Sequence, residues 1–201
     1  MKVLRVPLLL IVLPAVMTAF AAARQDQLVL DRPALATGQL WRLWSGHWVH
    51  FSRSHLFWNL TVFVLAGSWL GSVRPGLLAR HILLAAPCIS LAILACEPGL
   101  QVYGGLSGLA TSVVVLLALH QFTAVEARRW PWIGVLAMVF LKALVDLQQT
   151  TPLLATFTAP AVRTSTTAHA AGAICALLHH AGLRFQRLEM KPPGPVTGSR
   201  R

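Results

Sequence analysis

Six long apolar segments constrain the fold of this chain more than any other feature of its sequence. They lie at about 4–23, 54–73, 77–96, 107–122, 131–148 and 165–183. The hydrocarbon core of a bilayer is about 30 Å thick, so a helix needs roughly 20 apolar residues to cross it. The sequence therefore predicts an all-α membrane protein, with six transmembrane helices in one domain over residues 1–188.

The overall composition favours the same class. Of the 201 residues, 56% are apolar and 11% are charged, whereas about 25% are charged in a typical soluble domain. A soluble chain would need more polar surface, so a soluble domain is the weaker alternative. Cys88, Cys96 and Cys175 lie in or beside apolar segments without a CxxC pair, which is typical of small buried hydrophobic side chains.

The net charge of +11 is concentrated between and beyond the apolar segments. Eleven of the 17 basic residues fall at the N-terminus, in the 74–80 and 123–130 loops and in the tail. This bias is typical of the cytoplasmic side of a bilayer. No basic stripe interleaves with aromatic residues, so nucleic acid is not an expected partner. The basic, Pro- and Gly-containing tail, 189–201, is predicted to be disordered and cytoplasmic, where anionic lipid would attract it.

The first apolar segment allows two interpretations. Lys2 and Arg5, the apolar run that follows and Ala19-Phe20-Ala21 are typical of a secretory signal with a cleavage site. The alternative is an uncleaved first span. The five later segments favour the span, because an even number of helices keeps the basic tail on the cytoplasmic side.

A serine framed by glycines begins the fourth segment, in Gly104-Gly105-Leu106-Ser107-Gly108. Glycines let the backbone turn sharply, and a helix start offers free N–H groups and a dipole that favour negative charge. These properties suit a nucleophile beside an oxyanion hole. The structural alternative is a Gly-Gly turn with Ser107 as an N-cap.

A histidine lies on a small-residue face of the sixth segment. His169 shares that face with Gly172, Ala173 and Ala176. The fourth segment offers a matching face made by Gly108, Thr111 and Ser112. Because small residues let membrane helices pack closely, we expect this contact to bring His169 Nε2 within reach of Ser107 Oγ. The alternative is a histidine that only satisfies its own hydrogen bonds.

Polar residues also mark the start of the second segment, at His50, His55 and Asn59. His55 and Asn59 are four residues apart and so project from one helix face. An amide and an imidazole can both donate N–H hydrogen bonds, as an oxyanion requires. A polar helix end at the membrane interface is the alternative, and it suits Asn59 less because Asn59 lies deeper in the segment.

Together these residues resemble the rhomboid intramembrane serine proteases, from Trp41 to about Leu178. The motifs occur in the family's order: Trp41-Arg42 as WR, His50, His55 and Asn59 as HxxxxHxxxN, Gly105 to Gly108 as GxSG, and Ala168, His169 and Gly172 as AHxxG. The resemblance implies a rhomboid-like bundle of six transmembrane helices.

The resemblance also implies roles for individual residues. Ser107 would be the nucleophile and His169 its general base. His55, Asn59 and the Ser107 backbone N–H would bind the oxyanion, with His50, Gly105 and Leu106 in support. The sequence departs from the family at Thr111, where many bacterial rhomboids carry a tyrosine that stacks beneath the base.

Within the family, the short length and the run from Trp44 to His50 resemble the rhombosortase branch. Its substrates end in a Gly-Gly motif, an apolar helix and a basic tail. The expected partners are therefore membrane-anchored protein substrates and the lipid bilayer, in a bacterial inner membrane with the active site facing the periplasm. No cofactor and no metal are expected, and nothing in the sequence indicates an oligomeric state.

Two other functions stay open at this point. One is a non-catalytic, client-binding rhomboid-like protein, although such relatives usually lack the equivalent of Ser107 or His169. The other is a metal or haem site formed by His47, His50, His55 and His169, since histidine is the commonest metal ligand. No HExxH signature accompanies these histidines.

Overall fold

The computed structural model describes residues 16–17, 19–124, 128–148 and 165–189, and most of these are helical. The long helices are α5 (Arg53–Val73), α6 (Leu77–Cys96), α7 (Ser107–Phe122), α8 (Trp130–Gln148) and α9 (Thr166–Glu189). The short elements are α2 (Gln25–Leu28), β1 (Leu30–Asp31), α3 (Arg32–Ala36), α4 (Arg42–Ser45), the 3-10 helix η1 (Gly46–Trp48) and β2 (Val102–Tyr103).

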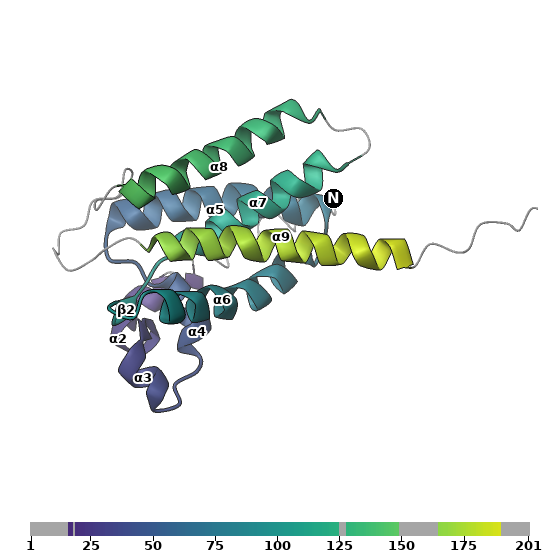
Figure 1. Ribbon diagram of the computed structural model, residues 1–201. Coiled ribbons are helices and arrows are strands. Elements are labelled where there is room, and N and C mark those ends of the chain that lie inside the picture. Colours follow the sequence, from purple (N-terminus) through teal and green to yellow (C-terminus); the bar gives the residue numbers. More distant parts are fainter. Residues whose placement is uncertain (1–15, 18, 125–127, 149–164, 190–201) are drawn as a thin grey trace, which may run out of the picture.

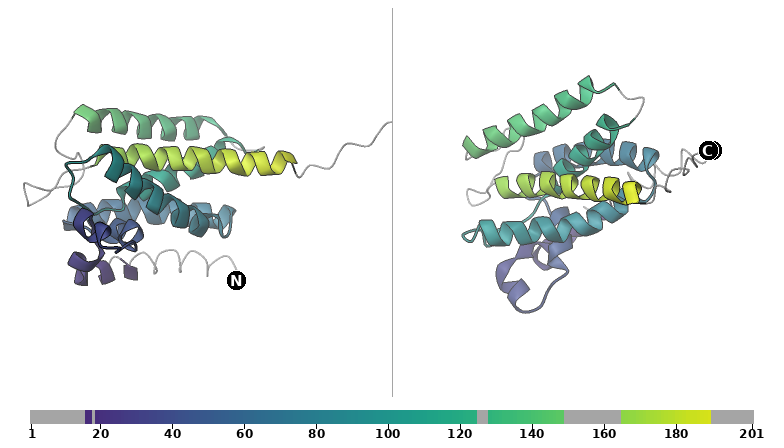
Figure 2. Two further views of the ribbon diagram at one scale, coloured as in Figure 1. Left: turned by 60° about the horizontal axis from the view of Figure 1, so that its bottom comes forward. Right: turned by 45° about the vertical axis from the view of Figure 1, so that its right-hand side comes forward.

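Helix α7 occupies the centre of the bundle. It packs most extensively against α9, and it also contacts α5, α6 and α8. Leu109, Val113 and Leu116 of α7 are fully buried in the resulting core. Helix α8 lies at one edge, whereas α2, α3 and α4 gather at one end of the molecule, beside α6 (Figures 1 and 2). Because α7 is central, side chains from several neighbouring helices can approach the residues at its first turn.

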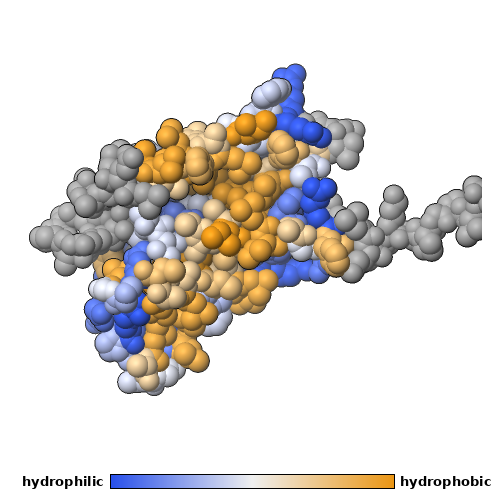
Figure 3. Space-filling view, in the orientation of Figure 1, coloured by the Kyte–Doolittle hydropathy of each residue, from blue (hydrophilic) through white to orange (hydrophobic). Residues whose placement is uncertain are grey.

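The surface of the bundle is strongly apolar. Leu65, Met138 and Leu178 are each 68% exposed, and hydrophobic residues cover the middle of the face drawn in Figure 3, while hydrophilic ones gather toward its two ends. Helices α5 and α6 are long and apolar enough to cross a membrane, and α7 and part of α8 are shorter apolar helices. Soluble monomers rarely expose apolar patches of this extent. The chain is a membrane protein with helical spans. That it has six transmembrane helices remains a prediction.

Four of the long helices begin and end within one residue of the apolar segments at 54–73, 77–96, 107–122 and 131–148. Helix α9 continues to Glu189, six residues beyond the segment that ends at 183. An apolar run marks only the part of a helix that contacts lipid, and the helix itself can continue beyond the lipid into a polar environment. Residues 4–15 and 18 of the first segment, and 190–201 of the tail, lie outside the described residues.

The described residues are mostly helical, as expected for an all-α protein, and two short strands of two residues each, β1 and β2, pair antiparallel beside the helices. Leu30 lies opposite Tyr103, and Asp31 opposite Val102. Gly46 allows this pairing, since a Cβ there would approach the Leu30 Cβ to 2.9 Å. The segment at 24–53, between the first two apolar segments, folds into short helices and a strand, and the strand holds Tyr103 next to the turn before α7.

Candidate active site

Ser107 is the first residue of α7 and is partly exposed, although Leu106 and Gly108 on either side of it are buried. The chain reaches it through Gly105, whose φ of 148° lies in a region that L-residues rarely adopt. A Cβ on Gly105 would also lie 2.8 Å from His55 Cε1. Both the backbone conformation and the close approach of His55 therefore require glycine at this turn.

His50 supports the same turn. Its Nε2 accepts a hydrogen bond from the Leu106 N–H over 3.4 Å, and its Nδ1 donates to the Trp48 carbonyl over 3.0 Å. Since a carbonyl can only accept, the second bond places the His50 proton on Nδ1. Burial lowers the pKa of His50 to about 4, so the ring is neutral at physiological pH and Nε2 stays an acceptor.

Tyr103 contacts the turn from the other side. Its hydroxyl donates to the Gly105 carbonyl over 2.9 Å and also interacts with the Ser107 side chain. Burial raises the pKa of the Tyr103 phenol well above its usual value, and the interaction with Ser107 partly opposes this. The phenol thus stays protonated as a donor. The motif comparison missed Tyr103, although it is the only tyrosine of the chain and lies four residues before Ser107.

His169 lies in the first turn of α9 and is 7% exposed. Ser165 caps this turn, because its Oγ accepts the Ala168 N–H over 3.0 Å. The Glu97 carboxylate accepts the Ser165 hydroxyl over 2.6 Å and the Thr167 N–H over 3.3 Å. The turn that carries His169 is thereby tied to the end of α6. Sequence reasoning missed Glu97 and Ser165. Glu97 lies 68 residues before Ser165 and 70 residues before Thr167 in the chain, so no local pattern indicates these hydrogen bonds.

Helices α7 and α9 meet through glycines. Gly172 lies against the Gly108 carbonyl oxygen, and a Cβ on Gly108 would lie 2.9 Å from the Ala168 carbonyl oxygen. The small faces expected to pack together are therefore in contact. Since Gly108 follows Ser107 and Ala168 precedes His169, this contact places the start of α7 beside the first turn of α9.

His55 and Asn59 complete the set on α5. Ser52 caps this helix by accepting the His55 N–H over 3.2 Å. The His55 ring lies 5.0 Å from that of His50, and His55 is close enough to His169 for their charges to interact. Asn59 Nδ2 is buried and has no hydrogen-bond partner among the described residues. The structure thus brings His50, His55 and His169 to the turn that carries Ser107, and leaves an amide donor one helical turn along α5.

A second serine–histidine pair lies deeper in the bundle. His81 Nε2 of α6 is 2.6 Å from Ser112 Oγ of α7, and His81 Nδ1 is 2.9 Å from His179 Nδ1 of α9. Ser112 is fully buried in the middle of α7, where backbone N–H groups are engaged within the helix and cannot bind an oxyanion. This geometry favours a structural role in joining three helices, and leaves Ser107 as the better-placed nucleophile.

The histidines considered as a metal site are arranged differently. His47 is fully buried, and its Nε2 bonds the Ala86 carbonyl over 2.9 Å and Ser90 Oγ over 3.1 Å. Within the described ranges, no group of three His, Cys, Asp or Glu side chains could hold a metal ion. His47 instead connects η1 to α6 and so holds the loop that carries His50.

The fold and the site define a helical membrane protein with a partly exposed serine at the start of one helix, packed beside the helix whose first turn carries a buried histidine. Residues 37–184 match the family described as the Rhomboid domain. Because this match covers more than half of the chain, the protein belongs to the rhomboid family, whose domain implies an intramembrane protease acting on membrane protein substrates. A comparison with curated proteins gives no match.

Proposed function

We propose that this protein is an intramembrane serine endopeptidase in which Ser107 is the nucleophile and His169 the general base. The observation that carries the proposal is the contact between Gly108 and the Ala168 carbonyl oxygen, which sets the helix start bearing Ser107 beside the turn bearing His169. A serine becomes a useful nucleophile only when an adjacent base removes its proton. The glycine contact supports that adjacency, because it brings the residues next to Ser107 and His169 together.

In this mechanism Ser107 Oγ attacks the carbonyl carbon of the scissile peptide bond while His169 takes the hydroxyl proton. The tetrahedral intermediate collapses when His169 gives this proton to the leaving amine. Water then attacks the acyl-enzyme, again with His169 as the base, and releases the new C-terminus. All proton transfers in these steps pass through His169, and water supplies the second nucleophile.

The developing oxyanion requires preorganised donors. The Ser107 backbone N–H is free because it lies at the first position of α7. Asn59 Nδ2 is buried without a partner in the described part of the chain, and the His55 ring lies against Gly105 in the same turn. We assign these three groups to the oxyanion hole, where each donor contributes roughly 3–4 kcal/mol to transition-state binding.

For the substrate, the rhombosortase resemblance favours membrane-anchored proteins that end in a Gly-Gly motif, an apolar helix and a basic tail. Small residues there would let the substrate helix unwind at Ser107. The basic bias of the 74–80 and 123–130 loops favours six spans in a bacterial inner membrane, with the Ser107 end facing the periplasm. Water must reach Ser107, so we expect the loops at 97–106 and 149–164 to gate the site, and the second of them lies outside the described residues.

The test is cleavage of a co-expressed membrane substrate with such a C-terminal segment, in cells that carry the wild-type protein, Ser107→Ala, His169→Ala or Ser112→Ala. We expect cleavage by the wild type and by Ser112→Ala, normalised to the amount of folded protein, and none by the other two. Cleavage by Ser107→Ala or His169→Ala at the wild-type rate would overturn the proposal, as would a loss confined to Ser112→Ala.

A fluorophosphonate probe distinguishes the protease from a non-catalytic, client-binding rhomboid. We expect labelling of the wild-type protein at Ser107, and loss of labelling in His169→Ala, because the probe reacts only with an activated serine hydroxyl. A peptide map that places the label elsewhere, or an unlabelled wild type that still binds membrane substrates, would favour the client-binding function.

A further inference from the structure

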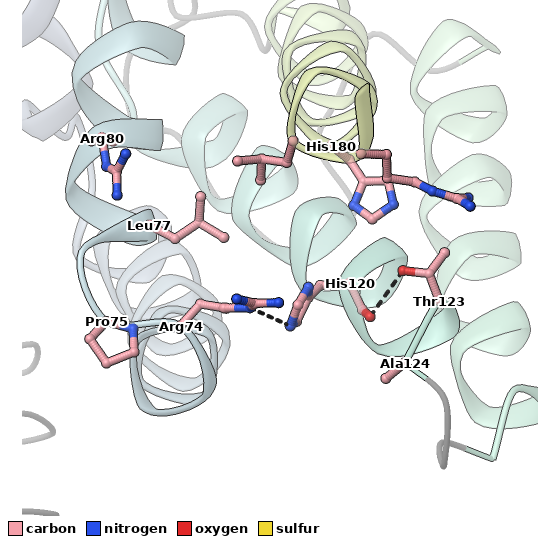
Figure 4. A pocket seen from close by; sticks show the side chains of 10 residues that line it. Arg74, Pro75, Leu77, Arg80, His120, Thr123, Ala124 and His180 are labelled. Carbon is pink, nitrogen blue, oxygen red and sulfur yellow. Dashed lines mark hydrogen bonds between the residues drawn. The ribbon is translucent and has the colours of Figure 1, made fainter. Parts of the chain in front are cut away.

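A basic cavity of about 570 Å³ opens at the end of the bundle away from Ser107. It lies between the turn after α5, the start of α6, the end of α7 and the last part of α9. Figure 4 shows the side chains of Arg74, Arg80, His120 and His180 around it. Arg184 also lines the cavity, and the remaining lining residues are small, apolar or uncharged.

Among the described residues, only positive charge lines this cavity. Three arginines and no acidic side chain of that part of the chain contribute to its walls. Arginine is always charged, and its planar fork binds two oxygens of a phosphate or carboxylate at once. Arg74 Nε donates to His120 Nε2 over 3.4 Å, and this leaves the terminal nitrogens of Arg74 for a ligand. His180 Nε2 is buried without a hydrogen-bond partner among the described residues.

The location of the cavity indicates what kind of anion it meets. Helix α7 runs from Ser107 to Phe122, about 24 Å at 1.5 Å per residue, so the two sites lie near opposite faces of the bilayer. The arginines belong to the turn after α5, the first turn of α6 and the last part of α9, and the basic bias assigns these segments to the cytoplasm. Leu77 and Leu183 add apolar surface to the same cavity.

We propose that this cavity binds the phosphate headgroup of an anionic phospholipid from the cytoplasmic leaflet. The arginines would hold the phosphodiester oxygens, and Leu77 and Leu183 would contact the glycerol and the first methylenes of the acyl chains. Basic pockets between helix ends at this face are suited to such headgroups. The proposal does not depend on the protease activity, because no residue of the cavity contributes to the site at Ser107.

The experiment measures lipid binding to the detergent-purified full-length protein by native mass spectrometry. Phosphatidylglycerol and phosphatidylcholine are titrated separately, and inorganic phosphate at millimolar concentration is a third arm. The double variant Arg74→Gln, Arg80→Gln removes two charges from the cavity. Its matched control, Arg128→Gln with Arg129→Gln, removes two exposed charges that line no part of it.

We expect the wild type and the control to bind phosphatidylglycerol in preference to phosphatidylcholine, and the Arg74/Arg80 variant to bind it roughly tenfold or more weakly, since two charge-assisted hydrogen bonds are lost. Ala124→Trp, which fills the cavity without changing any charge, should have a similar effect. Arg74→Lys with Arg80→Lys keeps both charges without the planar fork, so it should bind more tightly than the glutamine variant and more weakly than the wild type. Equal losses in the control, equal binding of both lipids, unchanged binding by Ala124→Trp, or displacement by inorganic phosphate would overturn the proposal.

Discussion

Gly172 of α9 lies directly against the carbonyl oxygen of Gly108 of α7. At this point the two helices approach so closely that no side chain fits between their backbones. The contact lies one helical turn from His169 and one residue from Ser107, so the distance between α7 and α9 determines whether the histidine can serve the serine.

We therefore expect Gly172→Ala to push α9 away from α7. A methyl group forced into a packed contact typically costs about 1–3 kcal/mol, and here it would also separate His169 from Ser107. The measurement is the thermal midpoint in detergent together with the cleavage rate. Gly182→Ala is the control, because no atom lies within 4 Å of a Cβ at that position of the same helix. Wild-type activity in Gly172→Ala would contradict this account.

Asn59→Ala should separate activity from stability. Since Asn59 Nδ2 has no hydrogen-bond partner within the described structure, loss of this donor breaks no hydrogen bond there and should lower the thermal midpoint little. If the amide binds the oxyanion, kcat should fall roughly 100- to 1000-fold while KM changes little. Ser68→Ala removes another buried, unpartnered polar atom from α5 and should keep full activity. Equal kcat values for the two variants would remove Asn59 from the oxyanion hole.

Ser165→Ala should weaken the turn that carries His169. The Ser165 hydroxyl caps α9 and bonds the Glu97 carboxylate, and loss of an N-cap costs about 1 kcal/mol. We expect a lower thermal midpoint and a kcat reduced more than KM is raised, because the base is less well held. Asp31→Ala removes the cap of α3 and should lower stability without this effect on kcat. A kcat as high in Ser165→Ala as in Asp31→Ala would argue against positioning through the cap.

Acid should destabilise the protein through His47. Burial lowers its pKa to about 4 from the usual 6.5, so between these values the unfolded chain binds a proton that the folded protein excludes. The contribution is present above pH 6.5 and is lost as the pH falls toward 4. His47→Gln keeps a donor for the Ala86 carbonyl but does not titrate. Between pH 6.5 and pH 4, we expect the thermal midpoint of His47→Gln to fall less than that of the wild type. An identical fall in the variant and the wild type would contradict this assignment.

Much of the fold could be predicted from local pattern alone. The limits of α5 to α8 follow from runs of apolar residues, because a helix that contacts lipid must be apolar over its length. The membrane class and the rhomboid resemblance of the motifs are confirmed, whereas the rhombosortase branch stays a prediction. The loop before α5 was the least predictable part, since its short helices and its β pairing depend on a strand more than 70 residues away.

The candidate site divides in the same way. Ser107, His169, His55 and Asn59 stand in motifs whose internal spacing is visible in the chain, and the small residues that let α7 and α9 meet are visible too. The residues that hold the site in place cannot be recognised from the sequence. Tyr103 bonds a backbone carbonyl, and Glu97 bonds Ser165, which lies 68 residues further along the chain. A pattern search for polar residues in apolar segments could have found His81, but not its bond to Ser112.

The sequence by itself determined where the long apolar helices run, which residues are the candidates for the chemistry and which loops are basic, because hydropathy, motif spacing and charge are properties of neighbouring residues. Only the tertiary structure decided that Gly172 meets Gly108, that Glu97 and Ser165 hold the turn of His169, and that three arginines from three segments of the chain line one cavity. These relationships join segments distant in the chain, and packing alone brings such segments together.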